Sequence, residues 1–392
     1  MTKQPSYRFA GYTEAWAEKK LGEVAEVNPK SVVPDEFKYV DLGAVVGTEM
    51  VSYRNETIST SPSRAQRLAI KGDVFYQTVR PYQKNNYLFE KDDNDYVFST
   101  GYAQLRPSGD GCFLLSYLQT NKFVNVVLDN CTGTSYPAIN SKDLSDIFIS
   151  LPSLSEQTAI GSFFQDIDQL ISLQQRKLEV LKEQKKTYLK LLFPAKGQKK
   201  PAFRFAGFED EWKEVKLGEA YSFSQGQQVP VEEQFEQINE NRIRFIRIVD
   251  LTNKGEEMRY IEFKSSTGRV YEKDIFFVRY GAVGVVGIGY DGIIANNLFR
   301  LNPQMSVDNK FMYVQFNREK FKKTLQGFSA STTMPAISFT DIRTIDIYLP
   351  SLPEQTAIGS FFQELDKVIA KQEEKVNQLK ESKQTLLRKM FI

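Results

Sequence analysis

The stretch GIGYDG (287–292) has the GxGxxG spacing with which a glycine-rich turn binds the phosphates of a dinucleotide. Such a turn needs a strand before it, a helix after it and an acidic residue about 20 positions further on. The residues that follow, IIANNLFRLNP, indicate another strand, so glycines in a β-turn region are the better interpretation. The chain also has no GxxxxGK[ST] phosphate loop and no Asn/Asp-Pro-Pro-aromatic motif of the amino-methyltransferases. The motifs therefore predict neither nucleotide hydrolysis nor methyl transfer.

Histidine is absent from the chain, which removes the commonest general base, the histidine-dependent triads and most zinc sites. We predict no metal site. Carboxylate, Ser–Lys and tyrosine chemistry is not removed, so an enzyme that works through carboxylates stays a hypothesis. The two cysteines, Cys112 and Cys131, indicate reduced thiols of a cytoplasmic protein rather than a disulfide framework.

The composition is that of a folded chain with little net charge. Its 392 residues, 41% of them apolar, are enough for two or three domains with cores of their own. No apolar run approaches the ~20 residues that span a bilayer. The net charge of +2 lacks the basic excess of a strong stand-alone nucleic-acid binder. If DNA is the partner, local basic patches or another subunit must supply the positive charge.

One segment occurs twice in the chain. LPSLSEQTAIGSFFQDID (151–168) and LPSLPEQTAIGSFFQELD (349–366) are identical at fifteen of eighteen positions and lie 198 residues apart. RFAGYTEAWAEKKLGE (8–23) likewise returns as RFAGFEDEWKEVKLGE (204–219), and a Pro-Ala-Ile turn precedes each LP. A period this long is too long for a solenoid and indicates two homologous domains. Between the repeated segments the halves diverge, which predicts a shared scaffold that presents two different surfaces.

Both divergent bodies are predicted to be compact α+β domains. Strand-like runs such as VFYQTV and RIRFIRIVDL alternate with short helical stretches such as GCFLLSYLQTNKFVNVVLDN and KFMYVQFNREKFKKTLQG. We therefore divide the chain into four parts: a first globular domain (1–152), a central helix and linker (153–200), a second globular domain (201–350) and a C-terminal helix (351–392).

Long helices are predicted behind both repeated segments, since no Gly or Pro interrupts residues 162–193 or 360–392. In a heptad frame the polar residues Gln174 and Gln372 interrupt the apolar positions at equivalent places. Matched polar breaks fix register and partner choice, so we predict that the helices pack on each other, antiparallel and with pseudo-two-fold symmetry. The alternative is that each helix packs on its own domain. The predicted coiled-coil seam consists of Phe164, Ile167, Ile171, Gln174, Leu178, Leu181, Phe362, Leu365, Ile369, Gln372, Val376 and Leu379.

The ordered duplication resembles the specificity subunit of type I restriction–modification enzymes. The matching elements are the paired LPSLxEQTAIGSFF segments, the long helices behind them, the RFAGF…W…LGE opening and the Pro-Ala-Ile turn before each LP. The resemblance covers the whole chain. It implies two target-recognition domains, each reading one half of a bipartite double-stranded DNA site, with helices that set the spacing and dock two methyltransferase subunits.

The same resemblance implies that this chain is not itself catalytic. S-adenosylmethionine would be bound by the methyltransferase subunits, and ATP and magnesium by restriction and translocase subunits. A coiled-coil adaptor that spaces two protein-binding modules is the alternative to DNA recognition. For the acid–amide pairs that open the helices, Glu156–Gln157 and Glu354–Gln355, two interpretations stay open: helix-start chemistry and a partner-docking surface.

Candidate DNA contacts follow from the chemistry of direct readout, in which Arg or Lys binds guanine and Asn or Gln binds adenine. In the first body, suitable side chains follow the VFYQTV strand and precede the Pro-Ala-Ile turn. In the second body they follow one strand, alternate along a second strand and precede the Pro-Ala-Ile turn. For each of them, a solvated surface residue is the alternative. The candidates are Arg80, Tyr82, Gln83, Lys84, Asn85, Asn86, Ser135 and Tyr136 in the first body, and Arg242, Arg244, Arg279, Tyr280, Ser331, Thr332 and Thr333 in the second.

Overall fold

The computed structural model describes residues 4–133, 135–195, 197–253, 255–329 and 336–391. The chain forms two compact units, the first from residues 1–177 and 372–392 and the second from residues 178–371. The boundary falls inside both long helices, α5 (Leu154–Leu191) and α11 (Leu352–Met390). The units thus differ from the four-part division of the sequence, because each body holds the end of the other repeat's helix in its core.

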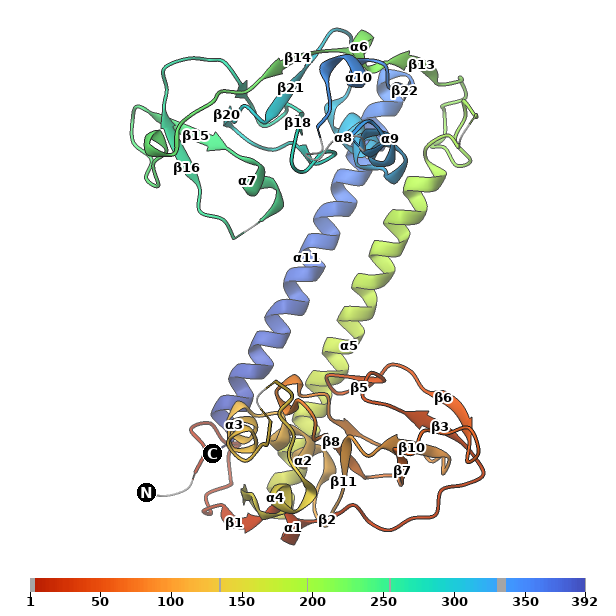
Figure 1. Cartoon of the computed structure of the whole chain (residues 1–392), viewed down its shortest axis with the longest axis vertical. Helices are drawn as coiled ribbons and strands as arrows, with labels where there is room; N and C mark the ends of the chain where they lie inside the picture. Colours follow the sequence, from red (N-terminus) through yellow and green to blue (C-terminus); the bar gives the residue numbers. More distant parts are fainter. Residues whose placement is uncertain (1–3, 134, 196, 254, 330–335, 392) are drawn as a thin grey trace. The chain divides into compact units, whose positions relative to one another are not determined.

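Two four-stranded sheets form the body of the first unit (Figure 1). One sheet is antiparallel, with the order β2-β11-β8-β9; the other has the order β6-β3-β10-β7 and contains the parallel pair β3–β10. The strands of the first sheet are β2 (Ala25–Val27), β11 (Tyr102–Pro107), β8 (Val74–Gln77) and β9 (Tyr87–Leu88). Those of the second are β6 (Arg54–Thr57), β3 (Glu36–Val40), β10 (Tyr96–Ser99) and β7 (Ala65–Leu68). Two short pairs are β1 (Ala17–Lys20) with β12 (Phe148–Leu151) and β4 (Val45–Val46) with β5 (Glu49–Met50).

Short helices complete the first unit, and the two predicted from GCFLLSYLQTNKFVNVVLDN are confirmed. Asp110 Oδ1 accepts a hydrogen bond from the backbone of Phe113 at 2.8 Å, and Thr120 caps the next helix in the same way. Such caps satisfy amide groups that a helix start leaves without partners. The helices are α1 (Leu21–Val24), η1 (Pro81–Gln83), α2 (Gly111–Leu118), α3 (Asn121–Asp129) and α4 (Ser141–Asp146).

The second unit repeats both four-stranded sheets and the short pair formed by its first and last strands, without a counterpart of β4–β5 among the described residues. Its sheets have the orders β14-β21-β18-β19 and β16-β15-β20-β17, and β15 and β20 are parallel. The strands are β13 (Lys213–Lys216), β14 (Tyr221–Gln225), β15 (Arg242–Ile246), β16 (Arg259–Glu262), β17 (Arg269–Val270), β18 (Phe276–Val278), β19 (Val286–Gly287), β20 (Gly292–Ile294), β21 (Leu298–Pro303) and β22 (Asp346–Leu349). The helices are α6 (Leu217–Ala220), η2 (Val231–Glu233), α7 (Ile248–Thr252), α8 (Asn309–Asn317), α9 (Glu319–Ser329) and α10 (Phe339–Arg343). The GIGYDG stretch leads into β20, so the strand predicted after it is confirmed.

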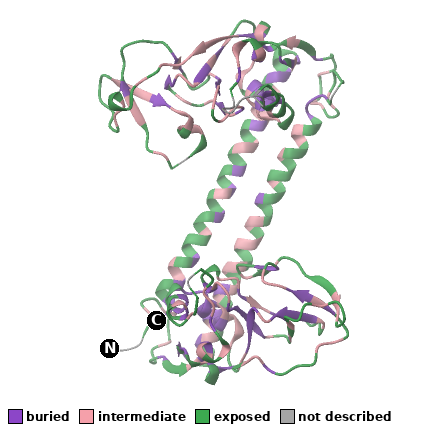
Figure 2. Cartoon of the chain, in the orientation of Figure 1, coloured by how far each residue is buried: buried purple, intermediate pink, exposed green. Residues whose placement is uncertain are grey.

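Each unit has buried apolar cores of its own. In the first unit the buried strands β8 and β10 place Phe75 and Phe98 face to face, with ring centroids 3.6 Å apart. Figure 2 shows buried residues concentrated on the central strands of each unit and on the helix ends that enter its core. Among the described residues, no helix combines the length and the apolar character that crossing a membrane requires.

Both long helices begin earlier than the Gly-free runs of the sequence, and they pass through Gly161 and Gly359. A Cβ atom on Gly161 would lie 2.7 Å from the backbone nitrogen of Phe113, and one on Gly359 would lie 2.6 Å from that of Phe311. Each long helix therefore contacts the first turn of α2 or α8 through its backbone. Only glycine fits this approach, which outweighs its low helix propensity.

In the first unit, the beginning of α5 pairs with the end of α11. Lys383 Nζ donates a hydrogen bond to Asp168 Oδ1, and Gln372 Nε2 donates one to Gln174 Oε1 at 3.0 Å. Residue numbers rise along one helix as they fall along the other, so the pair is antiparallel, as predicted.

The second unit contains the equivalent pair of helix segments. Lys185 Nζ lies 2.5 Å from Asp366 Oδ1, and the rings of Tyr188 and Phe361 meet edge to face with centroids 5.1 Å apart. The direction is again antiparallel. All the predicted seam residues are buried or half-buried.

Candidate nucleic-acid interface

The β8–β9 loop of the first unit, residues 78–86, has an unusual backbone. Arg80 and Lys84 adopt left-handed conformations with φ of 55° and 56° on either side of the η1 turn. Asn28 is the third non-glycine residue with positive φ among those described. Asparagine tolerates this region, whereas arginine and lysine are strained there, and such strain persists only where surrounding contacts enforce it.

Side-chain hydrogen bonds supply those contacts. Gln77 Nε2 donates to Val79 O at 2.6 Å and to Gln83 Oε1 at 2.9 Å. The ammonium group of Lys84 donates to Gln119 O at 2.9 Å, and Gln119 Nε2 donates back to Lys84 O at 3.0 Å. Burial, together with the nearby ammonium of Lys383, lowers the pKa of Lys84. The sequence did not single out Gln77 or Gln119, because nothing in their local pattern reveals contacts with a loop.

The turn before Pro137 lies against this loop. Arg80 N donates to Pro137 O at 2.8 Å, and Val79 forms a β-bridge with Ala138. The Arg80 guanidinium lies 4.3 Å from the centroid of the Tyr136 ring. Tyr136 and Tyr82 are exposed, at 62% and 50%. The structure thus brings together the two predicted clusters of the first body, with Arg80, Tyr82, Ser135 and Tyr136 at the surface or half-buried.

Other predicted contacts in this loop have internal partners instead. Asn86 is 1% exposed, and its Oδ1 accepts a hydrogen bond from Gln77 N at 2.9 Å. Asn85 Oδ1 accepts one from Gly47 N at 2.9 Å, and the ammonium group of Lys84 is used within the unit. Burial corrects the prediction for Asn86. Gln83, Lys84 and Asn85 each form a hydrogen bond that supports the loop, and their contact with DNA stays a prediction.

The second unit differs at the equivalent place. Arg279 follows β18, but its guanidinium donates to Ile337 O and to Gln225 Oε1, both at 3.3 Å. Tyr280 Oη donates to Asn296 O at 3.3 Å. Both side chains thus have hydrogen-bond partners inside the unit, whereas no hydrogen bond of the Arg80 guanidinium is found among the described residues. The predicted candidates Ser331, Thr332 and Thr333 lie outside the described residues.

Arg242 and Arg244 alternate along β15 and are half-buried, as the sequence predicted for one face of a strand. The guanidinium of Arg242 lies 3.5 Å from the centroid of Phe235, and that of Arg244 lies 5.0 Å from the centroid of Tyr290. In both residues Nε is buried without a hydrogen-bond partner. Their contact with DNA stays a prediction.

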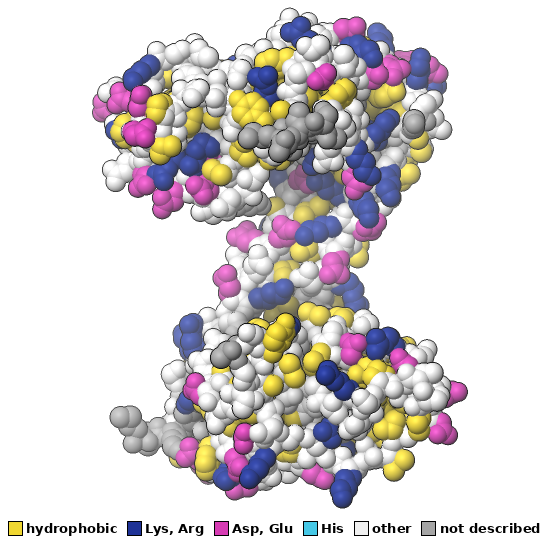
Figure 3. Space-filling view, in the orientation of Figure 1, with side chains coloured by type: hydrophobic (Ala, Val, Ile, Leu, Met, Phe, Trp, Pro, Cys, Tyr) yellow, Lys and Arg dark blue, Asp and Glu magenta, His cyan; other side chains and the backbone are white. Residues whose placement is uncertain are grey.

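The surface of each unit carries both signs of charge. Figure 3 shows Lys and Arg side chains interspersed with Asp and Glu over the visible face of each unit. The visible face of each unit therefore carries no broad basic surface.

The repeated EQ motif has an internal role in both units. Glu156 is 1% exposed and accepts two hydrogen bonds from Arg8, at 2.6 and 2.7 Å. Glu354 accepts the same pair from Arg204, at 2.7 and 2.6 Å. Gln355 is 3% exposed. Burial on this scale rules out both glutamates as a partner-docking surface and leaves the helix-start interpretation. In each unit the glutamate binds the arginine of the repeated segment 8–23 or 204–219 to the first turn of the long helix.

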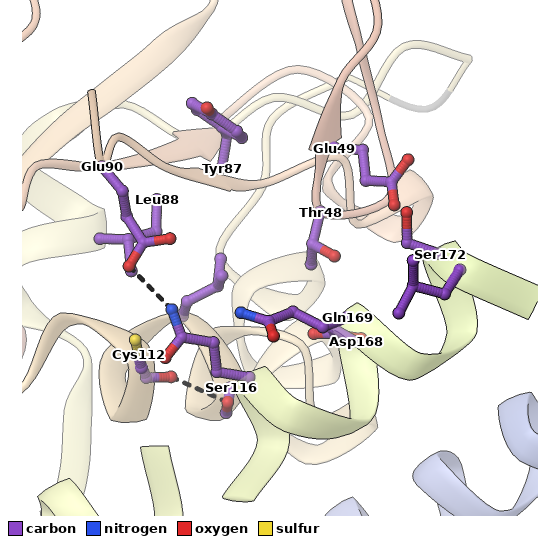
Figure 4. A pocket seen from close by; sticks show the side chains of 13 residues that line it. Thr48, Glu49, Tyr87, Leu88, Glu90, Cys112, Ser116, Asp168, Gln169 and Ser172 are labelled. Carbon is purple, nitrogen blue, oxygen red and sulfur yellow. Dashed lines mark hydrogen bonds between the residues drawn. The ribbon is translucent and has the colours of Figure 1, made fainter. Parts of the chain in front are cut away.

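A hollow of about 420 Å³ lies in the first unit between α5, α2 and the strands β5 and β9 (Figure 4). Glu90 on its wall accepts a hydrogen bond from Gln165 Nε2 at 2.8 Å. Burial, with Asp110 and Glu90 nearby, raises the pKa of Cys112 to about 12. The thiol that lines this hollow is therefore protonated at neutral pH and is a poor nucleophile. Among the described residues, no group of His, Cys, Asp and Glu side chains could hold a metal ion.

This pKa predicts slow alkylation of Cys112. The thiolate is the reactive form, and at pH 8 about one Cys112 in 10,000 is a thiolate in the folded chain, against roughly one in ten for an ordinary thiol. In a Cys131→Ser variant, we expect iodoacetamide to label Cys112 roughly 1,000-fold more slowly in the folded chain than in urea. The folded rate should rise about tenfold per pH unit above pH 8. Equal rates in the two states would contradict the raised pKa.

Comparison with known proteins identifies the family to which the two units and their loops belong. The family model described as the type I restriction modification DNA specificity domain matches twice, over residues 13–183 and 209–381. This chain belongs to that family. The two matches cover both bodies and extend into the long helices, to residue 183 in α5 and residue 381 in α11.

Specificity subunits of the family resemble the chain in sequence and in fold. The MjaVIII specificity subunit of Methanocaldococcus jannaschii is 23% identical over 278 residues, which is 65% of this chain and 64% of that protein. The chain thus spans just under two thirds of that relative's length. The crystal structure of the S subunit of a type I system from M. genitalium has a TM-score of 0.63 at 15% identity, with 99% of both chains covered. A structure from work on complex assembly of the type I system has a TM-score of 0.57 at 23% identity, covering 98% of this chain and 99% of that one.

Proposed function

We propose that this chain is the sequence-recognition subunit of a type I restriction–modification complex and that each unit reads one half of a bipartite DNA site. The observation that carries the proposal is a constant frame around different loops. The Arg8–Glu156 and Arg204–Glu354 pairs are equivalent in the two units. In contrast, Arg80 stacks on an exposed tyrosine while Arg279 bonds internally. Two units that share the same ion pair but differ in the loops at Arg80 and Arg279 suit two half-sites of different sequence.

The proposal extends to the partners. The two repeated helices offer near-equivalent surfaces on which two methyltransferase subunits would dock, and their fixed length would set the spacing of the half-sites. S-adenosylmethionine would be held by the methyltransferase subunits, and ATP and magnesium by translocase and restriction subunits, all in the cytoplasm. One of the similar structures was solved in work on complex assembly of the type I system, which supports such partners. In this scheme the present chain contributes binding and no catalytic step, in keeping with its missing motifs.

Methylation of DNA tests the proposal. The chain is produced with its cognate methyltransferase subunits in a host without adenine methylation, and the genome is read by modification-sensitive long-read sequencing. We expect methyl-adenine at a two-part motif with a fixed spacer, and none when this chain is omitted. Methylation that does not depend on the chain, or a chain that never co-purifies with methyltransferase subunits, would contradict the proposal and favour the adaptor.

A further inference from the structure

The β8–β9 loop of the first unit contains two non-glycine residues with positive φ, Arg80 and Lys84. Among the described residues, no acceptor is found for the guanidinium of Arg80. Arg80 donates its backbone amide to Pro137, but its guanidinium packs on the Tyr136 ring. A guanidinium has five donors in a planar fork. In the described part of the chain, none of the Arg80 guanidinium nitrogens is among the buried atoms without a partner, so the fork reaches solvent and is available to an acceptor from outside the chain.

The acceptor should be one whose recognition depends on orientation. The left-handed backbone at Arg80 and the stack on Tyr136 fix the direction of the fork, and the Gln77 and Lys84 hydrogen bonds hold the turn in place. A phosphate is bound by a guanidinium fork or, as a point charge, by a flexible lysine, so a fixed orientation is not required there. A guanine edge needs two donors aligned with O6 and N7 in the major groove.

We propose that Arg80 reads a guanine in the half-site bound by the first unit and that Tyr136 is its positioning residue. This inference rests on the proposed function. The exposed ring of Tyr136 lies beside the fork and would exclude water from the pair. The second unit has no equivalent reader at Arg279, whose donors bond Gln225 and Ile337.

The left-handed backbone at Arg80 permits a variant that removes the guanidinium without straining the loop. Glycine adopts φ of 55° without strain, so Arg80→Gly removes the fork while keeping or raising the melting temperature. Arg80→Lys keeps the charge but loses the bidentate geometry. Tyr136→Phe keeps the stack, and Tyr136→Ala removes it. Asn28→Gly is the matched control at another left-handed residue, and Lys142→Ala is the control for loss of one exposed positive charge in the same unit.

The experiment uses the complex of this chain with its methyltransferase subunits and measures binding to its motif, with each guanine replaced in turn by 7-deazaguanine. For the wild type we expect one guanine of one half-site whose replacement weakens binding about 10- to 100-fold. Arg80→Gly, Arg80→Lys and Tyr136→Ala should each weaken binding to the unmodified site. Arg80→Gly should then lose nothing further at that guanine, because the two changes remove the same contact. Tyr136→Phe, Asn28→Gly and Lys142→Ala should keep the wild-type response.

The outcomes separate this inference from the proposed function. A uniform loss of affinity for all sequences in Arg80→Gly, with a salt dependence reduced by about one charge, would mean a phosphate contact and would overturn the guanine assignment. An unchanged motif at full affinity would also overturn it. If the wild-type complex itself neither binds nor methylates a two-part site, the proposed function fails instead.

Discussion

Replacing Glu156 with alanine is expected to lower the free energy of unfolding of the first unit by about 3–5 kcal/mol, because it leaves the guanidinium of Arg8 in the protein without its carboxylate. The loss is measured by urea unfolding in a Trp212→Phe background. Trp16 is then the sole tryptophan of the chain and reports on the first unit, in whose core it is buried.

Two comparisons isolate the ion pair. Leucine at both Arg8 and Glu156 should cost less than Glu156→Ala alone, because neither charge is then left without a partner. Asp166→Ala, at an exposed position of α5 in the first unit, should change the unfolding free energy by no more than about 0.5 kcal/mol. A loss in Glu156→Ala no larger than in Asp166→Ala would show that the buried pair does not hold Arg8 and its neighbours to the helix.

Replacing Phe391 with alanine is expected to destabilise the first unit by about 3–5 kcal/mol, although the residue lies at the opposite end of the sequence. Phe391 is 8% exposed, and its ring lies 5.4 Å from that of Phe113 and 6.2 Å from that of Trp16 between centroids. Its removal leaves a cavity in an aromatic cluster that cannot collapse without moving the helix. Trp16 fluorescence, in the Trp212→Phe background, should show the loss in urea.

The second unit provides the matched variant. Phe193 contacts Trp212 and Phe311 at 5.6 and 5.5 Å, so Phe193→Ala in a Trp16→Phe background should cost the second unit a similar amount. Phe148, which is 58% exposed, is the control in the first unit, and its replacement by alanine should have a small effect. An unfolding curve of Phe391→Ala that overlays the wild type would refute a structural role for the end of the chain.

Much of the architecture followed from pattern alone. The repeated segments predicted two homologous domains, and the Gly-free runs predicted two antiparallel helices, because period and helix propensity are properties of local sequence. The helix starts predicted beside Glu156 and Glu354 are confirmed. The Gly-free runs alone would have placed these starts after Gly161 and Gly359, since a glycine needed for close approach has the same local signature as a helix breaker.

The candidate interface was predictable in part. Residue type and position after a strand identified Arg80, Tyr82 and Tyr136, which the structure brings to one place. The same criteria selected Asn86 and Arg279, whose hydrogen bonds are internal. Residue type states which bonds a side chain is able to form, but not whether the fold supplies the partner.

The sequence by itself determined the two-domain plan, the pair of long helices and the family, because these depend on repeated segments and on periodicities that neighbouring residues express. Only the tertiary structure decided that Arg8 meets Glu156, that Phe391 completes the core of the first unit, and that Arg80 lies on Tyr136. Each of these contacts joins residues far apart in the chain. Its formation depends on how the sheets and helices pack, and no local pattern encodes that packing.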